Sequence, residues 1–428
     1  MADQNVGSKE TKKKPIKVGN VVTGEDFFGR EKEMARFIGL LGDGAHILMT
    51  GQRRIGKSSL LIDASKRLQE DAICLYVDVE HCDSAKEVII NLIKQANELR
   101  SRLGSTMDGF FNLFKGMRDS VEEVSFDVVK LKLREGAIKD WQEMGDNILD
   151  WLSKNEKPVY IFFDELPVFV NRIIRNSANE IVPDQIKDAD IFLSWLRSKG
   201  IAYTGKLNFV ICGSIGIEPV LEQVNLSDRI NIFDSLHLSP WDLETSREFL
   251  QDRADGHKIE LLPGVKELVM EKLGVGIPHF VQKFMQNIQW DCMERETDIC
   301  GVDDVERIYK ERMLAVEGSM VLATYIERLE RTLGKKKFRL AKDLLTEAAV
   351  TDGLAGGTAM LIAEQYYDKR YKCIDVIRFL LKTFEHDGYL IQKENIYLFE
   401  NNLLKDHWKK EFSFLYSSPV QHVDKQKN

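Results

Sequence analysis

The sequence predicts an α/β protein whose parallel sheet is followed by an all-helical region and then by a winged helix. Three observations lead to this fold class. Between residues 45 and 240, short apolar runs alternate with helical stretches, which indicates a parallel sheet covered by helices on both faces. From residue 241 to residue 315, apolar residues recur only at helical spacing. Residues 316–416 contain several helical stretches, then a hairpin-like alternation and a last helix, which is the usual order in a winged helix.

Five short apolar runs are the expected strands of the parallel sheet. Apolar runs of this length suit strands that are buried on both faces. They cover residues 45–50, 73–79, 159–163, 207–212 and 235–238. The interval 80–158 is long for a crossover between the second and third strands, so we interpret it as a largely helical insertion of unknown role. It begins with an expected helix at 85–103, and a stretch that contains Gly and Phe follows at 104–116.

Helices are expected throughout the second half of the chain. In the all-helical region, glycines separate four helical stretches, which we interpret as a lid over the sheet domain. These stretches cover residues 241–255, 263–273, 278–294 and 302–313. In the winged helix we expect helices at 320–333, 338–349, 359–366, 374–387 and 401–412, with the hairpin at 388–399.

The predicted domain plan has five segments. A disordered basic tail is expected at 1–20, the sheet domain at 21–240, the lid at 241–315, the winged helix at 316–416 and a polar tail at 417–428. The insertion at 80–158 lies within the sheet domain. We interpret the first tail as a solvated leader, with an arm that binds nucleic acid or a partner as the alternative.

Composition limits the classes of function. The 428 residues are enough for two or three domains, and 43% hydrophobic with 30% charged residues is typical of a globular protein. A net charge of −8 excludes binding of nucleic acid by the whole surface, although a local basic face stays open. No apolar run is long enough to span a membrane or to form a signal peptide, so we expect a cytoplasmic protein without a membrane partner. The six cysteines form no C-x-x-C pair, which argues against a zinc site or a disulfide framework.

Residues 51–58 read GQRRIGKS and form a complete G-x-x-x-x-G-K-[ST] phosphate-binding loop. An apolar run precedes the loop and a helix start follows it, which is the context that the motif needs. The glycines let several N–H groups face one anion, Lys57 places a charge against the β- and γ-phosphates, and the Ser58 hydroxyl is a ligand for Mg²⁺. The expected nucleotide-binding residues here are Gly51, Gln52, Arg53, Arg54, Ile55, Gly56, Lys57, Ser58 and Ser59.

Two acids end the third apolar run. Asp164 and Glu165 follow residues 159–163 directly. Beside a phosphate-binding loop, this pair suits hydrolysis of a nucleoside triphosphate, in which Asp164 would hold Mg²⁺ and Glu165 would act as general base toward the attacking water. A strand that ends in two solvated acids is the simpler alternative, and the neighbouring loop is the reason that we prefer catalysis.

Ser214 and Arg229 are further candidates for catalysis. Ser214 follows the apolar run at 207–212, where it could contact the γ-phosphate or its water; the alternative is a plain serine in a turn. Arg229 could bind a phosphate bidentately, in its own or in a neighbouring subunit, and a surface salt bridge is equally expected. The roles of Arg53 and Arg54 are likewise undecided, because either could neutralise phosphates or hold the loop to an acid.

These motifs together resemble a known family. The run GQRRIGKSSLL at 51–61 is similar to the G-P-R-R-x-G-K-T-S-L-L loop of the archaeal-type ATPases, near the STAND and Orc/Cdc6-like branches of the AAA+ proteins. Similar motifs follow in order at 27–34, 161–165, 210–214, 228–229, 276–279, 386–390 and 397–408. There are departures as well. Gln52 and Ser58 replace the usual proline and threonine, Lys405 replaces a common arginine, and His279 stands where other AAA+ branches often have arginine.

The resemblance implies a switch driven by ATP. ATP with Mg²⁺ would bind between the sheet domain and the lid, and hydrolysis would change the angle between the domains. The resemblance also places Phe28, Gly29 and Arg30 beside the adenine, and Pro278 near the nucleotide at the start of a lid helix.

Three functions stay open on the sequence alone. The first is an ATPase switch that acts on a protein partner, for example in defence against mobile elements, with turnover stimulated by the partner and with assembly into a homo-oligomer as an option. The second is an ATP-dependent DNA-binding protein that uses the winged helix, because residues 335–342 form a basic cluster, to which Lys369, Arg370 and Lys372 add charge. The third is a scaffold locked by nucleotide with little turnover, against which Glu165 counts.

Overall fold

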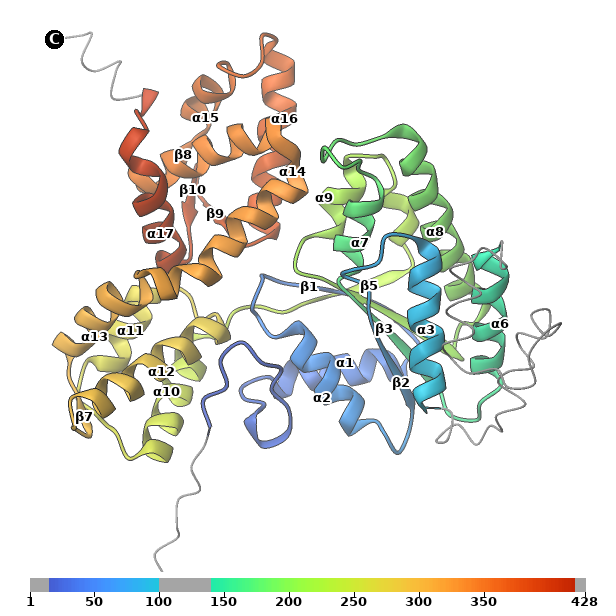
Figure 1. Ribbon diagram of the computed structural model, residues 1–428, viewed down its shortest axis with the longest axis horizontal. Helices are drawn as coiled ribbons and strands as arrows, with labels where there is room; N and C mark the ends of the chain where they lie inside the picture. Colours follow the sequence, from blue (N-terminus) through green and yellow to red (C-terminus); the bar gives the residue numbers. More distant parts are fainter. Residues whose placement is uncertain (1–14, 100–139, 420–428) are drawn as a thin grey trace, which may run out of the picture.

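The computed structural model describes residues 15–99 and 140–419, which form three parts (Figure 1). The first part is built around five parallel strands. They are β1 (His46–Thr50), β2 (Ile73–Asp78), β3 (Val159–Asp164), β4 (Leu207–Cys212) and β5 (Phe233–His237). Their order across the sheet is β2-β3-β4-β1-β5. Each predicted apolar run coincides with one strand, so the predicted α/β fold is confirmed.

Helices cover both faces of the sheet, because successive side chains of a strand point to opposite faces. On β3, Tyr160 and Phe162 are buried in a core with residues of α1 (Glu31–Gly42) and α2 (Lys57–Arg67). Ile161 and Phe163 are buried in the core on the other face. That core includes residues of α3 (Ala85–Leu99), α6 (Trp141–Ser153), α7 (Leu166–Ile173), α8 (Pro183–Ala202) and α9 (Ile217–Glu222).

The predicted insertion is described only at its two ends. α3 and α6 pack on the sheet as ordinary covering helices, so these ends belong to the fold of the sheet domain. The stretch predicted at 104–116 and the end of the helix predicted at 85–103 lie outside the described residues.

The register of the strands brings their carboxyl ends to one edge of the sheet. Asp78 of β2 is the neighbour of Asp164 of β3, and Met49 of β1 is the neighbour of Cys212 of β4. The loop after β1 therefore starts beside the polar residues that end β3 and β4. In open α/β sheets, ligands bind at this edge.

The lid contains α10 (Leu243–His257), α11 (Val265–Leu273), α12 (Pro278–Glu294) and α13 (Val302–Ile308), followed by a π-helical turn at Tyr309–Met313. We predicted that this region is wholly helical, and the structure corrects that prediction. β6 (Glu260–Leu261) and β7 (Ile299–Cys300) form a two-stranded parallel sheet within the lid. Strands of two residues are too short to show the alternation that marks a strand in a sequence.

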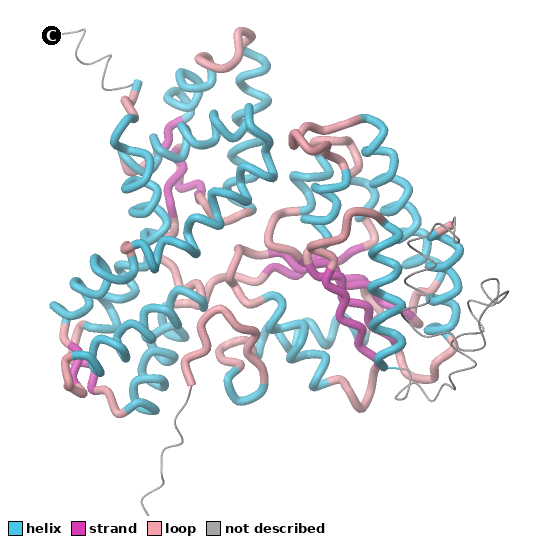
Figure 2. The backbone as a smooth tube through the Cα atoms, in the orientation of Figure 1, coloured by secondary structure: helices cyan, strands magenta, loops and turns pink. Residues whose placement is uncertain are grey.

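The C-terminal part has the element order and the sheet of a winged helix. β8 (Leu354–Ala355), β9 (Leu390–Lys393) and β10 (Ile396–Phe399) form an antiparallel sheet in the order β8-β10-β9. It is packed with α15 (Gly356–Ala363), α16 (Arg370–His386) and α17 (Asn402–Phe412). Figure 2 shows these strands apart from the larger sheet.

The two helices predicted at 320–333 and 338–349 belong to one element, α14 (Val316–Val350). It is broken at Gly334, where φ is 73° and ψ is 161°. Glycine adopts this left-handed φ without steric cost, so the chain changes direction there. The first section of α14 therefore leads from the lid, and the second section forms the first helix of the winged helix.

α14 contacts both other parts of the molecule. Phe280 of α12 and Tyr325 of α14 stack with 6.4 Å between ring centres, inside an apolar core that the lid and the winged helix share. On the other side, the Arg175 guanidinium donates to the Thr332 carbonyl at 2.7 Å and to Gln223 Oε1 at 3.1 Å. α14 is thus bonded to the sheet domain. No helix in the described part of the chain has the length and apolar character that a membrane crossing requires.

Candidate nucleotide-binding site

The loop at residues 51–56 joins β1 to α2 and depends on two glycines. Gly51 has a φ of 138° and Gly56 a φ of 101°, both in the region that glycine adopts most easily. A Cβ atom at Gly51 would lie 2.6 Å from the Leu238 carbonyl oxygen, so no larger residue fits. The loop therefore passes close to the end of β5 and places Lys57 and Ser58 in the first turn of α2.

Lys57 is folded back over the loop that it follows. Its Nζ donates to the carbonyl oxygens of Gly51 at 2.6 Å and Gln52 at 3.0 Å. The side chain is buried, and this burial lowers the pKa of the ammonium. A buried cation of this kind is poorly solvated, so an anion that enters the loop would gain a strong electrostatic partner.

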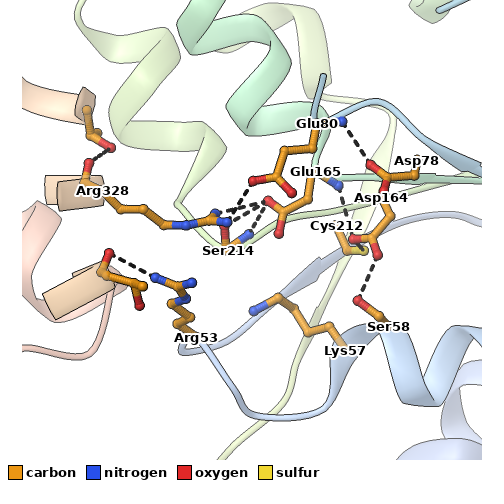
Figure 3. A network of polar contacts seen from close by, with 12 residues as sticks. Arg53, Lys57, Ser58, Asp78, Glu80, Asp164, Glu165, Cys212, Ser214 and Arg328 are labelled. Atoms are coloured by element: carbon orange, nitrogen blue, oxygen red, sulfur yellow. Dashed lines mark hydrogen bonds and ion pairs between the residues drawn. The ribbon is translucent and has the colours of Figure 1, made fainter. Parts of the chain in front are cut away.

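Asp164 is the centre of a hydrogen-bond network at the end of β3 (Figure 3). Its Oδ2 accepts hydrogen bonds from the Ser58 hydroxyl at 2.7 Å and from the Tyr76 hydroxyl. Its Oδ1 accepts from the Cys212 thiol at 2.9 Å and from the Glu165 N–H at 3.0 Å. The two predicted Mg²⁺ ligands, Ser58 and Asp164, are therefore in direct contact. Hydroxyl and carboxylate oxygens are the ligands that Mg²⁺ prefers.

Glu165 follows Asp164 in a left-handed conformation, with a φ of 61°. Its Oε2 accepts two hydrogen bonds of 2.8 Å from Ser214, one from the backbone N–H and one from the hydroxyl. Burial raises the pKa of the Glu165 carboxyl, and the positive charge of Arg328 opposes this shift. Ser214 thus fixes the direction of a carboxylate that is a stronger base than an exposed one.

Arg328 is a site residue that the sequence did not reveal. It comes from α14, and its Nη2 donates to Glu80 Oε1 at 2.8 Å, while its Nη1 lies 3.7 Å from Glu165 Oε2 (Figure 3). Arg328 belongs to no motif, and its spacing in α14 is that of an ordinary helical residue. Only the docking of α14 brings it to the acid pair.

The arginines of the loop have different surroundings. Arg53 Nη1 donates to the Thr324 carbonyl at 2.9 Å, and its guanidinium lies 5.5 Å from the centre of the Tyr325 ring. Burial lowers the pKa of Arg53 to about 10. Arg53 therefore joins the loop to α14. Arg54 has a left-handed φ of 67°, and its Nε has no hydrogen-bond partner among the described residues.

The motif at residues 28–30 packs against the loop and the lid. The Arg30 guanidinium donates to Glu33 Oε1 at 2.6 Å and to the Ile55 carbonyl at 3.3 Å, so it holds the backbone of the loop in place. Phe28 meets the Trp241 ring edge-on, with 5.8 Å between ring centres. A Cβ atom at Gly29 would lie 2.5 Å from the Thr245 side chain, which explains the glycine.

A cavity of about 290 Å³ lies at this site, close to the lower end of the ~300–1,000 Å³ range of small-molecule sites. Thirteen of the predicted residues line it: Phe28, Arg30, Arg53, Arg54, Ile55, Gly56, Lys57, Ser58, Ser59, Asp164, Glu165, Ser214 and Pro278. Lys17 and Asp26 also line the cavity, and Lys17 Nζ lies 2.6 Å from Asp26 Oδ2. Lys17 belongs to the segment 1–20 that we predicted to be a tail. The N-terminal segment is thus one wall of the site.

Several nitrogen atoms of the lining residues have no hydrogen-bond partner in the described part of the chain. They are Arg54 Nε, Trp241 Nε1, His279 Nε2 and Arg328 Nη1. Burial, together with the nearby cations, lowers the pKa of His279 to about 3, so its ring is neutral. Because buried polar groups are normally paired, these atoms fit a polar, anionic ligand such as a nucleotide.

Three of the predicted nucleotide-binding residues do not line the cavity. Gly51 and Gly29 shape the backbone and do not line the cavity themselves. Gln52 is turned toward the winged helix, where its Nε2 donates to Glu400 Oε2 at 3.3 Å. A Cβ atom at Gly388 would lie 2.3 Å from the Gln52 side chain, so the two are in close contact.

Arg229 is not brought into the cavity of its own chain. It is on a short 3₁₀ helix, Ser227–Ile230, where its Nε lies 2.6 Å from Asp190 Oδ1 and its Nη1 also contacts Asp228. The two acids hold the guanidinium on the surface, away from the residues that line the cavity. Of the alternatives that the sequence left open for Arg229, the surface salt bridge is the arrangement observed in the chain.

The fold and the loop together define a P-loop NTPase fold with a lid and a C-terminal winged helix. No family model matches the sequence, and no curated protein does. Solved structures do match. The Walker-type ATPase of Pyrococcus abyssi is 18% identical, with a TM-score of 0.61 over 92% of this chain and 99% of the other. The ORC2 protein of Aeropyrum pernix, in complexes with ADPNP and ADP, is 13% identical, with a TM-score of 0.53 over 94% and 97%. The resemblance to archaeal-type ATPases is therefore confirmed at the level of the fold.

Proposed function

We propose that this protein binds ATP with Mg²⁺ and hydrolyses it as an AAA+/STAND-like switch. One observation carries the proposal: Lys57, Ser58, Asp164 and Glu165 line a single cavity, although they come from two separate segments of the chain. That cavity also contains nitrogen atoms without partners, as a site for a polyanion requires. The ATPase and the ADPNP complex among the similar folds are consistent with this reading, which rests on the residues of this chain.

The residues have separate roles in this proposal. The loop and Lys57 bind the phosphates, and Ser58 and Asp164 would hold Mg²⁺, which would supply positive charge against the phosphate oxygens. Ser214 orients Glu165 through its two hydrogen bonds to Oε2, so that the carboxylate can take a proton from the attacking water. The raised pKa of Glu165 makes it a better base near neutral pH.

The contacts of the loop suggest how nucleotide could act as a switch. Arg53 binds α14 and Gln52 contacts the winged helix, so a rearrangement of the phosphate loop changes contacts with both. We propose that the winged helix transmits this change to a protein partner. A role in defence against mobile elements and assembly into a homo-oligomer, in which Arg229 would serve a neighbouring subunit, are parts of the same proposal.

Phosphate release from ATP by the purified chain, with and without Mg²⁺, tests the enzyme. The variant Glu165→Gln should keep ATP and lose hydrolysis, and proteins that co-purify with it in the presence of ATP are the candidate partners. If neither the wild-type chain nor a mixture with those partners hydrolyses ATP, and Glu165→Gln changes nothing, the alternative of a nucleotide-locked scaffold is correct.

A second candidate function is ATP-dependent DNA binding, which α16 favours. This helix exposes Arg370, Lys372 and Arg378. Of the lysines that we expected to contact DNA, Lys335 and Lys336 are exposed and Lys337 is half-buried, and two of the three lie over aromatic rings. Lys336 lies over the Tyr367 ring at 4.5 Å, and Lys337 lies over the Phe379 ring at 4.7 Å. A DNA surface would therefore be centred on α16.

Duplex binding at several salt concentrations tests the DNA function. Contacts between basic side chains and DNA phosphates release counterions, so they produce a steep decrease of affinity with salt. The charge reversals Arg370→Glu and Lys372→Glu should remove binding if α16 is the surface, while Lys336→Glu serves as the comparison. Equal binding by all three variants, or no binding by the wild type, rejects this function.

A further inference from the structure

Arg328 is the residue of α14 that reaches the acid pair of the sheet domain. Its Nη2 donates to Glu80 Oε1 at 2.8 Å, and its Nη1 lies 3.7 Å from Glu165 Oε2, a distance too long for a hydrogen bond. Nη1 is buried without a hydrogen-bond partner in the described residues, and Arg328 lines the cavity. One edge of the guanidinium is thus hydrogen-bonded to Glu80, and the other edge forms only an ion pair with Glu165, so its N–H groups can still donate to a ligand.

Most other cations around the cavity are held by the protein itself; the exception is Arg54, whose Nε has no hydrogen-bond partner among the described residues. Lys57 donates to two loop carbonyls, Arg30 to Glu33 and Ile55, and Arg53 to Thr324. The lid, at the start of α12, presents the neutral ring of His279. Of these groups, Arg328 lies closest to the carboxylate proposed to activate water, and it is borne by an element outside the sheet domain and the lid.

The position beside Glu165 distinguishes ATP from ADP. The attacking water must lie between the general base and the γ-phosphorus, so the γ-phosphate of bound ATP would be close to Glu165 Oε2. A guanidinium next to that oxygen is placed to bind a γ-phosphate oxygen, as arginine does well because of its fork of N–H donors. ADP has no group that extends to this position.

We propose that Arg328 binds the γ-phosphate of ATP and thereby makes α14 sensitive to whether ATP or ADP is bound. This inference rests on the proposed ATPase function and names the residue that reads the nucleotide. Contact with the γ-phosphate would weaken the bond from Arg328 to Glu80. Because α14 continues through Gly334 into the winged helix, the displacement of Arg328 is passed to that domain.

Calorimetric titration with two nucleotides tests the proposal. The probes are adenylyl imidodiphosphate with Mg²⁺ and ADP with Mg²⁺, each added to the full chain. The variant Arg328→Ala should bind the triphosphate analogue about tenfold more weakly or worse, because a charge-assisted hydrogen bond is lost, while its affinity for ADP stays within about twofold. Arg328→Lys should recover part of the loss. Arg331→Ala, an exposed position on the same helix, is the matched control and should leave both affinities unchanged.

The outcomes separate this inference from the proposed function. If the wild-type chain binds neither nucleotide, both fail. If the wild-type chain prefers the triphosphate analogue and Arg328→Ala keeps that preference, or loses affinity for both nucleotides equally, the inference alone is overturned. Glu80→Gln is a second variant, which keeps the Arg328 side chain and so tests the proposal even if Arg328→Ala fails to fold. It removes the charge that competes for Arg328, so it should strengthen the preference for the triphosphate. A weaker preference in that variant also overturns the proposal.

Discussion

The Ser58 hydroxyl donates a hydrogen bond of 2.7 Å to Asp164 Oδ2, which joins the first turn of α2 to the end of β3. The two residues are the predicted ligands of Mg²⁺. Their contact shows that a cation bound to one would also be within reach of the other after a small adjustment. Three other donors surround Asp164, so its carboxylate is fixed in place before any ligand binds.

The first prediction concerns Mg²⁺. Asp164→Asn replaces a negative ligand by a neutral one, so hydrolysis at saturating ATP should fall about 100-fold, because a bound metal contributes several kcal/mol to phosphoryl transfer. The half-saturating Mg²⁺ concentration should rise as well. A Mg²⁺ titration of phosphate release measures both quantities. Asp184→Asn, an exposed position on α8, is the control. An unchanged Mg²⁺ requirement in Asp164→Asn would exclude this residue as a ligand.

The second prediction concerns the phosphate loop. Lys57→Ala removes a buried cation that is satisfied only by two carbonyl groups of the loop, so the fold should persist and the melting temperature should change little. ATP affinity should fall about 100-fold or more, since a lysine–phosphate pair at ~4 Å is worth about 4 kcal/mol. Lys66→Ala, on the exposed end of the same helix, should bind ATP normally. Nucleotide affinity and thermal melting of the three chains decide the matter.

The third prediction concerns the general base. Glu165→Gln should bind ATP as the wild type does and should lower single-turnover hydrolysis about 100-fold or more. Ser214→Ala removes one of the two hydrogen bonds that orient Glu165, so a loss of about threefold to tenfold is expected. Glu156→Gln, an exposed substitution of the same kind, is the control.

The raised pKa of Glu165 also predicts how the rate of hydrolysis depends on pH on the acid side. Burial raises the pKa of Glu165, and a base must be deprotonated to act. An exposed glutamate has a pKa of about 4.3. As pH falls, the rate of hydrolysis should therefore begin to decline at a pH above this value. The rate of single-turnover hydrolysis between pH 5 and 8 measures this decline. A rate that stays constant until the usual range of glutamate contradicts the assignment.

Local motifs explain why much of the site could be predicted. The loop at 51–58 and the pair Asp164-Glu165 are short runs whose chemistry depends on neighbours in the chain, and their apolar flanks identify them as strand ends. Parallel strands then bring both runs to the same edge of the sheet.

The remaining site residues depend on tertiary packing. Arg328 and Tyr325 lie in α14, more than 250 positions after the loop that they approach, and nothing in their local pattern differs from an ordinary helix. Tyr76 lies within the apolar run at 73–79, where nothing in the sequence marks it as a site residue, yet its hydroxyl donates to Asp164. In the opposite direction, Arg229 has the expected sequence context but is held at the surface by Asp190. Docking of distant elements, which a single sequence does not express locally, decides all of these cases.

The last prediction concerns the contact between the winged helix and the sheet domain. His386, at the end of α16, lies between two acids: its Nε2 is 3.0 Å from Glu218 Oε2 of α9, and its Nδ1 is 3.5 Å from Asp387 Oδ1. Burial alone would lower the pKa of His386, but the two carboxylates outweigh burial and raise it to about 9. The charged imidazolium is therefore part of the interface at neutral pH.

A folded-state pKa above the unfolded value of about 6.5 stabilises the folded chain most at low pH. The full contribution of His386 is present below about pH 6.5, and it decreases as pH rises through about 9, where the ring loses its proton in the folded chain. Partial solvent exposure reduces its size, so we expect about 1–3 kcal/mol. His386→Gln should lower the melting temperature at pH 6 by several degrees relative to wild type, and the difference should shrink by pH 10. Calorimetry across this range measures it, with the exposed substitution His81→Gln as control. A difference between the two chains that stays constant from pH 6 to pH 10 would show that the charge of His386 does not stabilise this interface.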